Sequence, residues 1–269
     1  MNSQNSNPDI TKIEKCPSDV QDIFIPEGQR IKVSDAINWI GDAWSFISTK
    51  LGVWVLMGIT YSIIEFSIML IPKLGFILFN LLEPVFIAGI IAICETQRTT
   101  GKFKFRQLFY GFRHKFGALL KVGMVVCGIK VFGYLLVALI EGEDLYRAVF
   151  DDFYSAMNYN DDSSEFSFLS LGITIIYLFL TTAYSWFSPA LIILNNVKFK
   201  QAIITSFNVV CENIGGIILF FIIIYILIVI SGLPLLIGLL FTTPLYMATS
   251  YSSYRSIFYK KEVKNNEVN

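Results

Sequence analysis

Three ionisable side chains lie inside long apolar stretches of this sequence: Glu65, Glu83 and Lys130. Such residues are rare in membrane-spanning segments and often functional, because an unpaired charge at mid-bilayer costs at least ~2.5 kcal/mol. At about 1.5 Å per helical residue, Glu65 lies about 9 Å from the outer end of its segment, Glu83 about 13 Å and Lys130 about 15 Å. We therefore predict a Glu83–Lys130 ion pair. It either orients two helices or belongs to a polar site for an ion, a proton or a lipid head group.

Asn80 completes this predicted intramembrane polar site. It precedes Glu83 by three residues, so the two side chains share one face of a helix. We expect Asn80 to donate a hydrogen bond to the Glu83 carboxylate. Glu65 is then either protonated or bound to another group.

Motifs typical of enzymes and metal sites are missing from the sequence. It has one histidine, His114, which excludes a multi-histidine zinc or haem site and an H-E-x-x-H motif. It has no Walker A loop and no G-x-S-x-G nucleophile elbow. We therefore expect no enzymatic activity, no metal and no cofactor, although catalysis by a membrane-embedded carboxylate is an open alternative.

A basic segment follows the second apolar stretch. Residues 98–121 include seven Lys or Arg and no Asp or Glu. Basic clusters attract anionic lipids of the inner leaflet at about 1 kcal/mol per residue, and they are also the ordinary signal of a cytoplasmic loop. We predict lipid-head-group contacts for five residues interleaved with phenylalanines: Lys102, Lys104, Arg106, Arg113 and Lys115.

Long apolar helices must position these residues. Of the 269 residues, 54% are hydrophobic and 16% are charged, whereas a soluble domain has about 25% charged residues. A spanning helix needs roughly 20 apolar residues. The sequence predicts an all-α integral membrane protein with six transmembrane helices in three hairpins, at residues 51–71, 74–94, 118–140, 167–194, 214–230 and 233–249.

The three hairpins form an internal repeat. An amphipathic stretch precedes each one, and we predict an interfacial helix there, with its apolar face in the lipid or packed on the bundle. In the first repeat this face contains Ile37, Ile40, Trp44 and Ile47. The second segment of each hairpin contains a proline, which kinks the helix to frame a cavity or serves packing alone. These prolines are Pro84, Pro189 and Pro244.

Charge predicts the orientation of the chain. Residues 141–165 include eight Asp or Glu and one Arg, so this acidic loop is placed opposite the basic segment, with both termini cytoplasmic. The acidic side chains form a solvated face or bind divalent cations weakly. We predict a disordered cytoplasmic tail at residues 1–28 and a membrane domain at 29–258, which includes the acidic outer loop 141–166. Residues 259–269 are predicted to be a cytoplasmic C-terminal tail.

Several short motifs within residues 33–258 are characteristic when taken together. They are Trp39-Ile40, Glu83-Pro84-Val85-Phe86, Leu108-Phe109-Tyr110-Gly111-Phe112, Phe187-Ser188-Pro189-Ala190-Leu191 and Tyr254-Arg255-Ser256-Ile257-Phe258. Together they resemble an uncharacterised proteobacterial family of six-span inner-membrane proteins. The layout is more distantly similar to YciC-type proteins and to the membrane-anchor domain of glycerophosphodiester phosphodiesterases. The resemblance implies a multi-pass protein of the bacterial inner membrane and no assigned catalytic residue, since the phosphodiesterase catalytic domain is absent from this sequence.

Two functions are consistent with these patterns. The first is a non-enzymatic inner-membrane protein that supports cell-envelope integrity or barrier function by binding lipids, chiefly anionic ones, or a membrane-protein partner. The second is a transporter or channel for a small solute or ion, which uses Glu65, Glu83 and Lys130. Nucleic acid is not expected as a partner, because the pI is about 6.6 and the basic residues lie beside apolar segments. A polar cavity that reaches the three ionisable residues would favour the second function.

Overall fold

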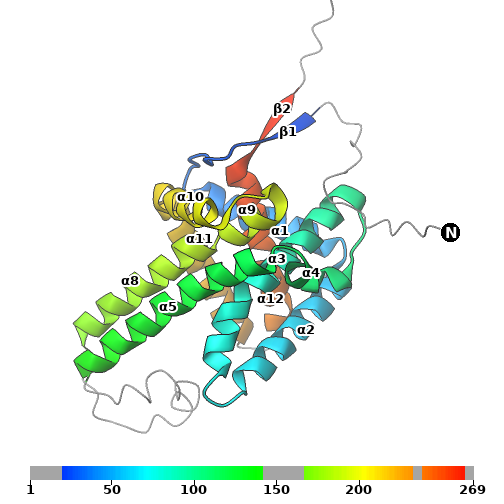
Figure 1. Ribbon diagram of the computed structural model, residues 1–269. Helices are drawn as coiled ribbons and strands as arrows, with labels where there is room; N and C mark the ends of the chain where they lie inside the picture. The colour runs from blue at the N-terminus through cyan, green and yellow to red at the C-terminus, as the bar shows by residue number, and fades with distance from the viewer. Residues whose placement is uncertain (1–19, 142–166, 233–237, 264–269) are drawn as a thin grey trace, which may run out of the picture.

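The computed structural model is a bundle of helices with a short two-stranded sheet at one end (Figure 1). It describes residues 20–141, 167–232 and 238–263. The elements before the acidic loop are β1 (Val20–Phe24), α1 (Asp35–Ser48), α2 (Leu51–Met69), α3 (Gly75–Thr100), η1 (Phe105–Phe109), α4 (Tyr110–Arg113) and α5 (Phe116–Glu141). Those after it are α8 (Phe168–Ser185), α9 (Ser188–Asn195), α10 (Phe199–Glu212), α11 (Ile214–Gly232), α12 (Leu239–Phe258) and β2 (Tyr259–Val263).

Five helical regions are long and apolar enough to cross a membrane, judged by length and composition: α2, α3, α5, α8 with α9, and α11. The prediction of an all-α protein with several membrane-crossing helices is therefore confirmed. The count of six spans and the three-hairpin arrangement stay predictions. The acidic loop lies outside the described residues, apart from Glu141 at the end of α5.

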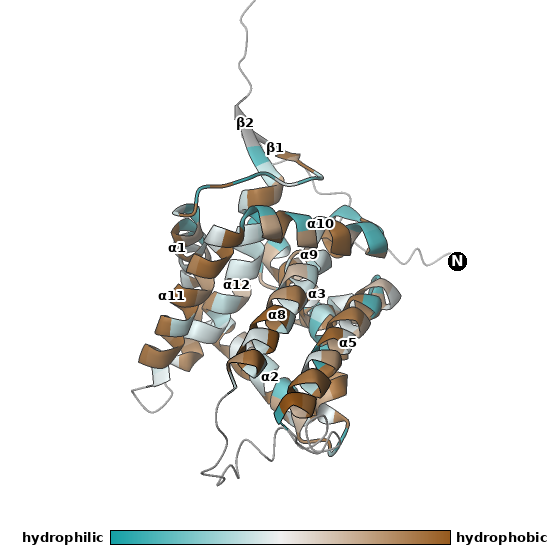
Figure 2. Ribbon diagram, turned by 90° about the vertical axis from the view of Figure 1, so that its left-hand side faces the viewer, coloured by the Kyte–Doolittle hydropathy of each residue, from teal (hydrophilic) through white to brown (hydrophobic). Residues whose placement is uncertain are grey.

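The sixth predicted span corresponds to α12, which is displaced along the sequence. We predicted residues 233–249, whereas α12 begins at Leu239 and continues to Phe258. More than half of its residues are buried, and it contacts α1, α2, α3 and α11. Its ribbon is pale in Figure 2, which marks intermediate hydropathy, while those of α5, α8 and α11 are largely brown, the colour of hydrophobic residues. A helix that is largely enclosed by other helices needs little lipid-facing apolar surface, which agrees with its lower hydropathy.

The amphipathic stretches before the hairpins differ in form. The first and third are the helices α1 and α10, but the second is the 3₁₀ turn η1 followed by the four-residue α4. On α1, Ile47 of the predicted face is buried, whereas Ile37 and Trp44 are 56% and 45% exposed. The buried positions include Ala36 and Ala43 instead. The face of α1 that packs on the bundle is therefore lined by Ala36, Trp39, Ala43 and Ile47, and the exposed Ile37 and Trp44 are the part of the predicted face that could lie in lipid.

The predicted tails, 1–28 and 259–269, each contain a strand within the described residues, β1 in the first and β2 in the second. We assigned residues 1–28 to a disordered tail, but residues 20–24 form β1, which pairs antiparallel with β2. Phe24 stacks on Phe258 with ring centroids 6.3 Å apart, and Asp22 forms ion pairs with Arg98 and Arg255. Side-chain anchoring to α3 and α12 therefore holds this segment at one end of the bundle (Figure 1).

The three repeat prolines occupy different helical positions. Pro84 and Pro244 lie inside α3 and α12, whereas Pro189 lies in the first turn of α9, just after the chain leaves α8. Proline has no N–H to donate to the preceding turn, which fits the break between α8 and α9. At Pro244, α12 meets α2 closely: a Cβ added to Gly58 would lie 3.2 Å from Pro244 Cδ.

Candidate ligand-binding site

A cavity of about 350 Å³ lies between α2, α3, α5, α8, α11 and α12. Its lining includes Glu65 of α2, Glu83 of α3 and Lys130 of α5. These residues come from three different helices, and the bundle brings all three to one space. The fourth predicted residue, Asn80, is buried beside the cavity and contacts Lys130.

Lys130 is held between two residues of α3. Its Nζ donates a hydrogen bond to Asn80 Oδ1 at 2.5 Å and lies 3.9 Å from Glu83 Oε2. The structure therefore contains the Glu83–Lys130 pair that we predicted. The role that we predicted for Asn80 is wrong, because its Nδ2 donates to the Phe76 carbonyl at 2.8 Å instead of to Glu83. The amide oxygen is left to accept from the lysine, so Asn80 positions the cation and not the carboxylate.

Glu65 is the carboxylate without a counter-charge in this cavity. Within the described part of the chain, no hydrogen bond or ion pair joins its carboxylate to another side chain. If both carboxylates are ionised, Glu65 and Glu83 outnumber Lys130 and the cavity has a net charge of about −1. A charge enclosed by protein is strongly unfavourable unless it is paired. Glu65 is thus suited to bind a cation or a proton.

Aromatic rings form much of the cavity wall. Trp186 lies between Phe221 and Tyr246, with ring centroids 5.4 Å and 6.0 Å away, and all three line the cavity. Tyr61 and Phe79 line it as well. The face of an aromatic ring attracts a cation by about 0.5–2 kcal/mol, and cages of such rings recognise ammonium groups. Carboxylates and aromatic faces together favour an organic cation over a bare metal ion.

The predicted lipid-contact residues lie elsewhere. Lys102, Lys104, Arg106, Arg113 and Lys115 are all exposed, and none lines the cavity. The phenylalanines between them, including Phe103, Phe105 and Phe112, pack against the core. The basic side chains therefore project outward from an anchored segment. This segment is on the β1–β2 end of the bundle, since Arg98 at the end of α3 bonds to Asp22 of β1 at 3.3 Å.

Sequence reasoning missed a second ionic cluster, at that same end. Arg98 Nη2 donates to Glu95 Oε1 at 2.6 Å, and Tyr251 Oη donates to the other oxygen of this carboxylate. Arg255 Nη2 donates to Asp22 Oδ2. The spacing of Glu95 and Arg98, three residues apart on one helix, was a usable signal for their pair. The sequence gives no sign of the role of Asp22, because this residue lies in a polar segment that is distant in sequence from Arg98 and Arg255.

The fold and the cavity define a class: a bundle of membrane-crossing helices around a polar cavity with excess carboxylate. Comparison of the chain with protein-family models, with curated proteins and with solved structures yields no match. The resemblance to six-span inner-membrane proteins therefore stays a prediction.

Proposed function

We propose that this protein binds a small organic cation in its central cavity and carries it across the membrane. The observation that carries the proposal is the cavity itself, in which Glu65 and Glu83 face one lysine and several aromatic rings. Of the two functions that the sequence favours, the transporter requires such a cavity. The envelope role does not.

Each polar residue has a part in this proposal. Lys130 balances Glu83, and Asn80 holds the lysine in place. Glu65 then accepts hydrogen bonds from the cation, while the aromatic wall contacts its other side. Because an unpaired carboxylate inside the bundle is unfavourable, Glu65 binds a proton when no cation is present. Binding of the cation displaces that proton, so the two are exchanged at one carboxylate.

Uptake of radiolabelled methylammonium by proteoliposomes tests this function. We expect uptake above that of protein-free liposomes, and a loss of about tenfold or more in Glu65→Gln, since a hydrogen bond to a charged group contributes about 1.5–3 kcal/mol. Asp42→Asn is the matched control, because Asp42 is exposed on α1 and lines neither the cavity nor the groove described below. Uptake that is equal in wild type and Glu65→Gln, or no greater than in protein-free liposomes, would rule out the proposal.

The exposed basic segment favours a second candidate function. In it, the protein is a non-enzymatic inner-membrane component that contacts anionic lipids or a membrane-protein partner and supports the cell envelope. The basic segment and both described chain ends lie at the same end of the bundle, which supports a cytoplasmic location for all of them. A deletion strain with unchanged envelope permeability and drug sensitivity would count against this role.

A further inference from the structure

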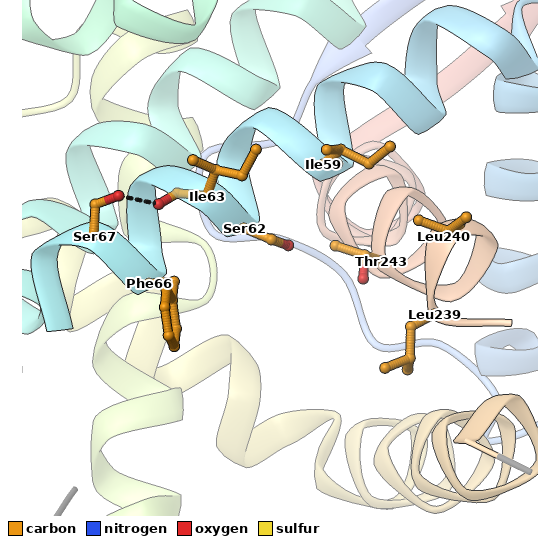
Figure 3. A pocket seen from close by; sticks show the side chains of 9 residues that line it. Ile59, Ser62, Ile63, Phe66, Ser67, Leu239, Leu240 and Thr243 are labelled. Atoms are coloured by element: carbon orange, nitrogen blue, oxygen red, sulfur yellow. Dashed lines mark hydrogen bonds between the residues drawn. The ribbon is translucent and has the colours of Figure 1, made fainter. Parts of the chain in front are cut away.

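An apolar groove adjoins the polar cavity at the crossing of α2 and α12. Its volume is about 370 Å³, and its walls include Ile59, Ile63 and Phe66 of α2 and Leu239 and Leu240 of α12. Figure 3 shows Ser62 on α2 extending toward Thr243 on α12 across this space. The isoleucines and Phe66 are 37–61% exposed. The groove is therefore open on the outer surface of the bundle, where we place the lipid.

The groove and the cavity share one residue and adjoin on one helix. Thr243 lines both of them. On α2, Glu65 of the cavity is one residue from Phe66 and three from Ser62, which line the groove, so the two faces of this helix adjoin at Glu65. At Gly58 the helices α2 and α12 are in close contact, because a Cβ added to this glycine would be 3.2 Å from the ring of Pro244. This contact narrows the groove at Gly58.

The dimensions of the groove fit one acyl chain. Its α2 wall runs from Gly58 to Ser67, and nine steps of 1.5 Å give about 14 Å. One leaflet occupies about half of a hydrocarbon core that is ~30 Å thick. The groove thus has the length of a leaflet's acyl chains, and most of its lining is apolar, with Ser62, Ser67 and Thr243 as the hydroxyl residues.

We propose that the ligand is an amphiphile with a positively charged amine head group, whose head binds at Glu65 in the cavity and whose chain lies in the α2–α12 groove. This inference rests on the proposed function and names its substrate class. Charge complementarity selects the head: two carboxylates with one lysine favour an ammonium over a phosphate or a carboxylate. Glu65 anchors the head group, while lateral opening of the groove admits the chain from the bilayer.

The test uses a ten-carbon alkylamine with a photoreactive diazirine at the end of its chain, in phosphatidylcholine nanodiscs that contain the full-length protein. Crosslinked peptides are mapped by mass spectrometry. We expect label in α2 and α12 at the groove, reduced about tenfold by Glu65→Gln, which removes a charge-assisted hydrogen bond. Ser62→Phe fills the groove and should reduce the label similarly. Ile222→Phe, a matched change at a position of α11 that is 51% exposed, should leave it unchanged.

The corresponding ten-carbon alcohol controls for partitioning into the bilayer. If the amine labels exposed positions such as Ile222 as strongly as the groove, in the pattern of the alcohol, the inference is refuted. Methylammonium uptake that depends on Glu65, together with such dispersed labelling, would refute the amphiphile and leave the transport of small cations. Localised labelling without methylammonium uptake would support the amphiphile site and refute transport of the small cation.

Discussion

Removal of the Lys130 charge should destabilise the protein through the carboxylate that it leaves behind. Loss of one partner of a buried ion pair costs about 3–5 kcal/mol. The side chains of Lys130 and Glu83 are 21% and 32% exposed and 3.9 Å apart, so we expect about half of that range, or ~2 kcal/mol, for Lys130→Met. For a chain of this size, ~2 kcal/mol corresponds to a decrease of about 4–8 °C in Tm.

The double variant Glu83→Gln/Lys130→Met distinguishes the interaction energy of the pair from the separate effects of the two substitutions. It removes both charges, so its stability should return to within about 1 kcal/mol of wild type. The measurement is the thermal unfolding of the detergent-solubilised protein, followed by circular dichroism, for the complete cycle of four proteins. Lys121→Met on the same helix is the control, because Lys121 is exposed and lines neither the groove nor the cavity. If the double variant loses as much stability as the two single variants added together, the coupling is zero and the proposed pairing is wrong.

Two further predictions concern the packing of the bundle. Asp22→Ala removes the acceptor for Arg98 and Arg255, so we expect release of β1, seen as faster proteolysis of the N-terminal segment than in Glu27→Ala, whose side chain is exposed. Gly58→Leu forces a side chain against Pro244 and should lower stability by about 1–3 kcal/mol, measured as a decrease in Tm. No decrease would show that α2 and α12 separate freely at this crossing.

The apolar helices could be predicted because a spanning helix consists of one continuous run of apolar residues. The predicted segment 214–230 became α11 (Ile214–Gly232), and 118–140 became α5 (Phe116–Glu141). Contacts between distant segments leave no such local record. Asp22 bonds to Arg98 and Arg255, which are 76 and 233 residues away. Its segment therefore read as a polar tail, although it is ordered.

The candidate site could be predicted where charge stands out against an apolar background. Glu65, Glu83 and Lys130 were recognisable because ionisable residues are rare in such segments. The aromatic residues of the cavity wall could not be recognised in this way. The chain has 24 phenylalanines and 13 tyrosines, and nothing in the sequence distinguishes Tyr246 from the rest. The Asn80 hydrogen bond was assigned to the wrong partner for a related reason. Its acceptor role depends on α5, a different helix, and not on spacing within α3.

The weakest apolar signal among the predicted spans belongs to α12, and this weakness is itself informative. The helix supplies Thr243, Tyr246 and Ser250 to the cavity. These residues, together with the polar segment 252–256 near its C-terminal end, lower its hydropathy. A helix enclosed by apolar neighbours can keep polar side chains only where they face one another or a polar space, because lipid offers them no hydrogen bonds. The helix α12, which is not among the five long apolar helical regions, is therefore one of the helices that supply polar residues to the cavity.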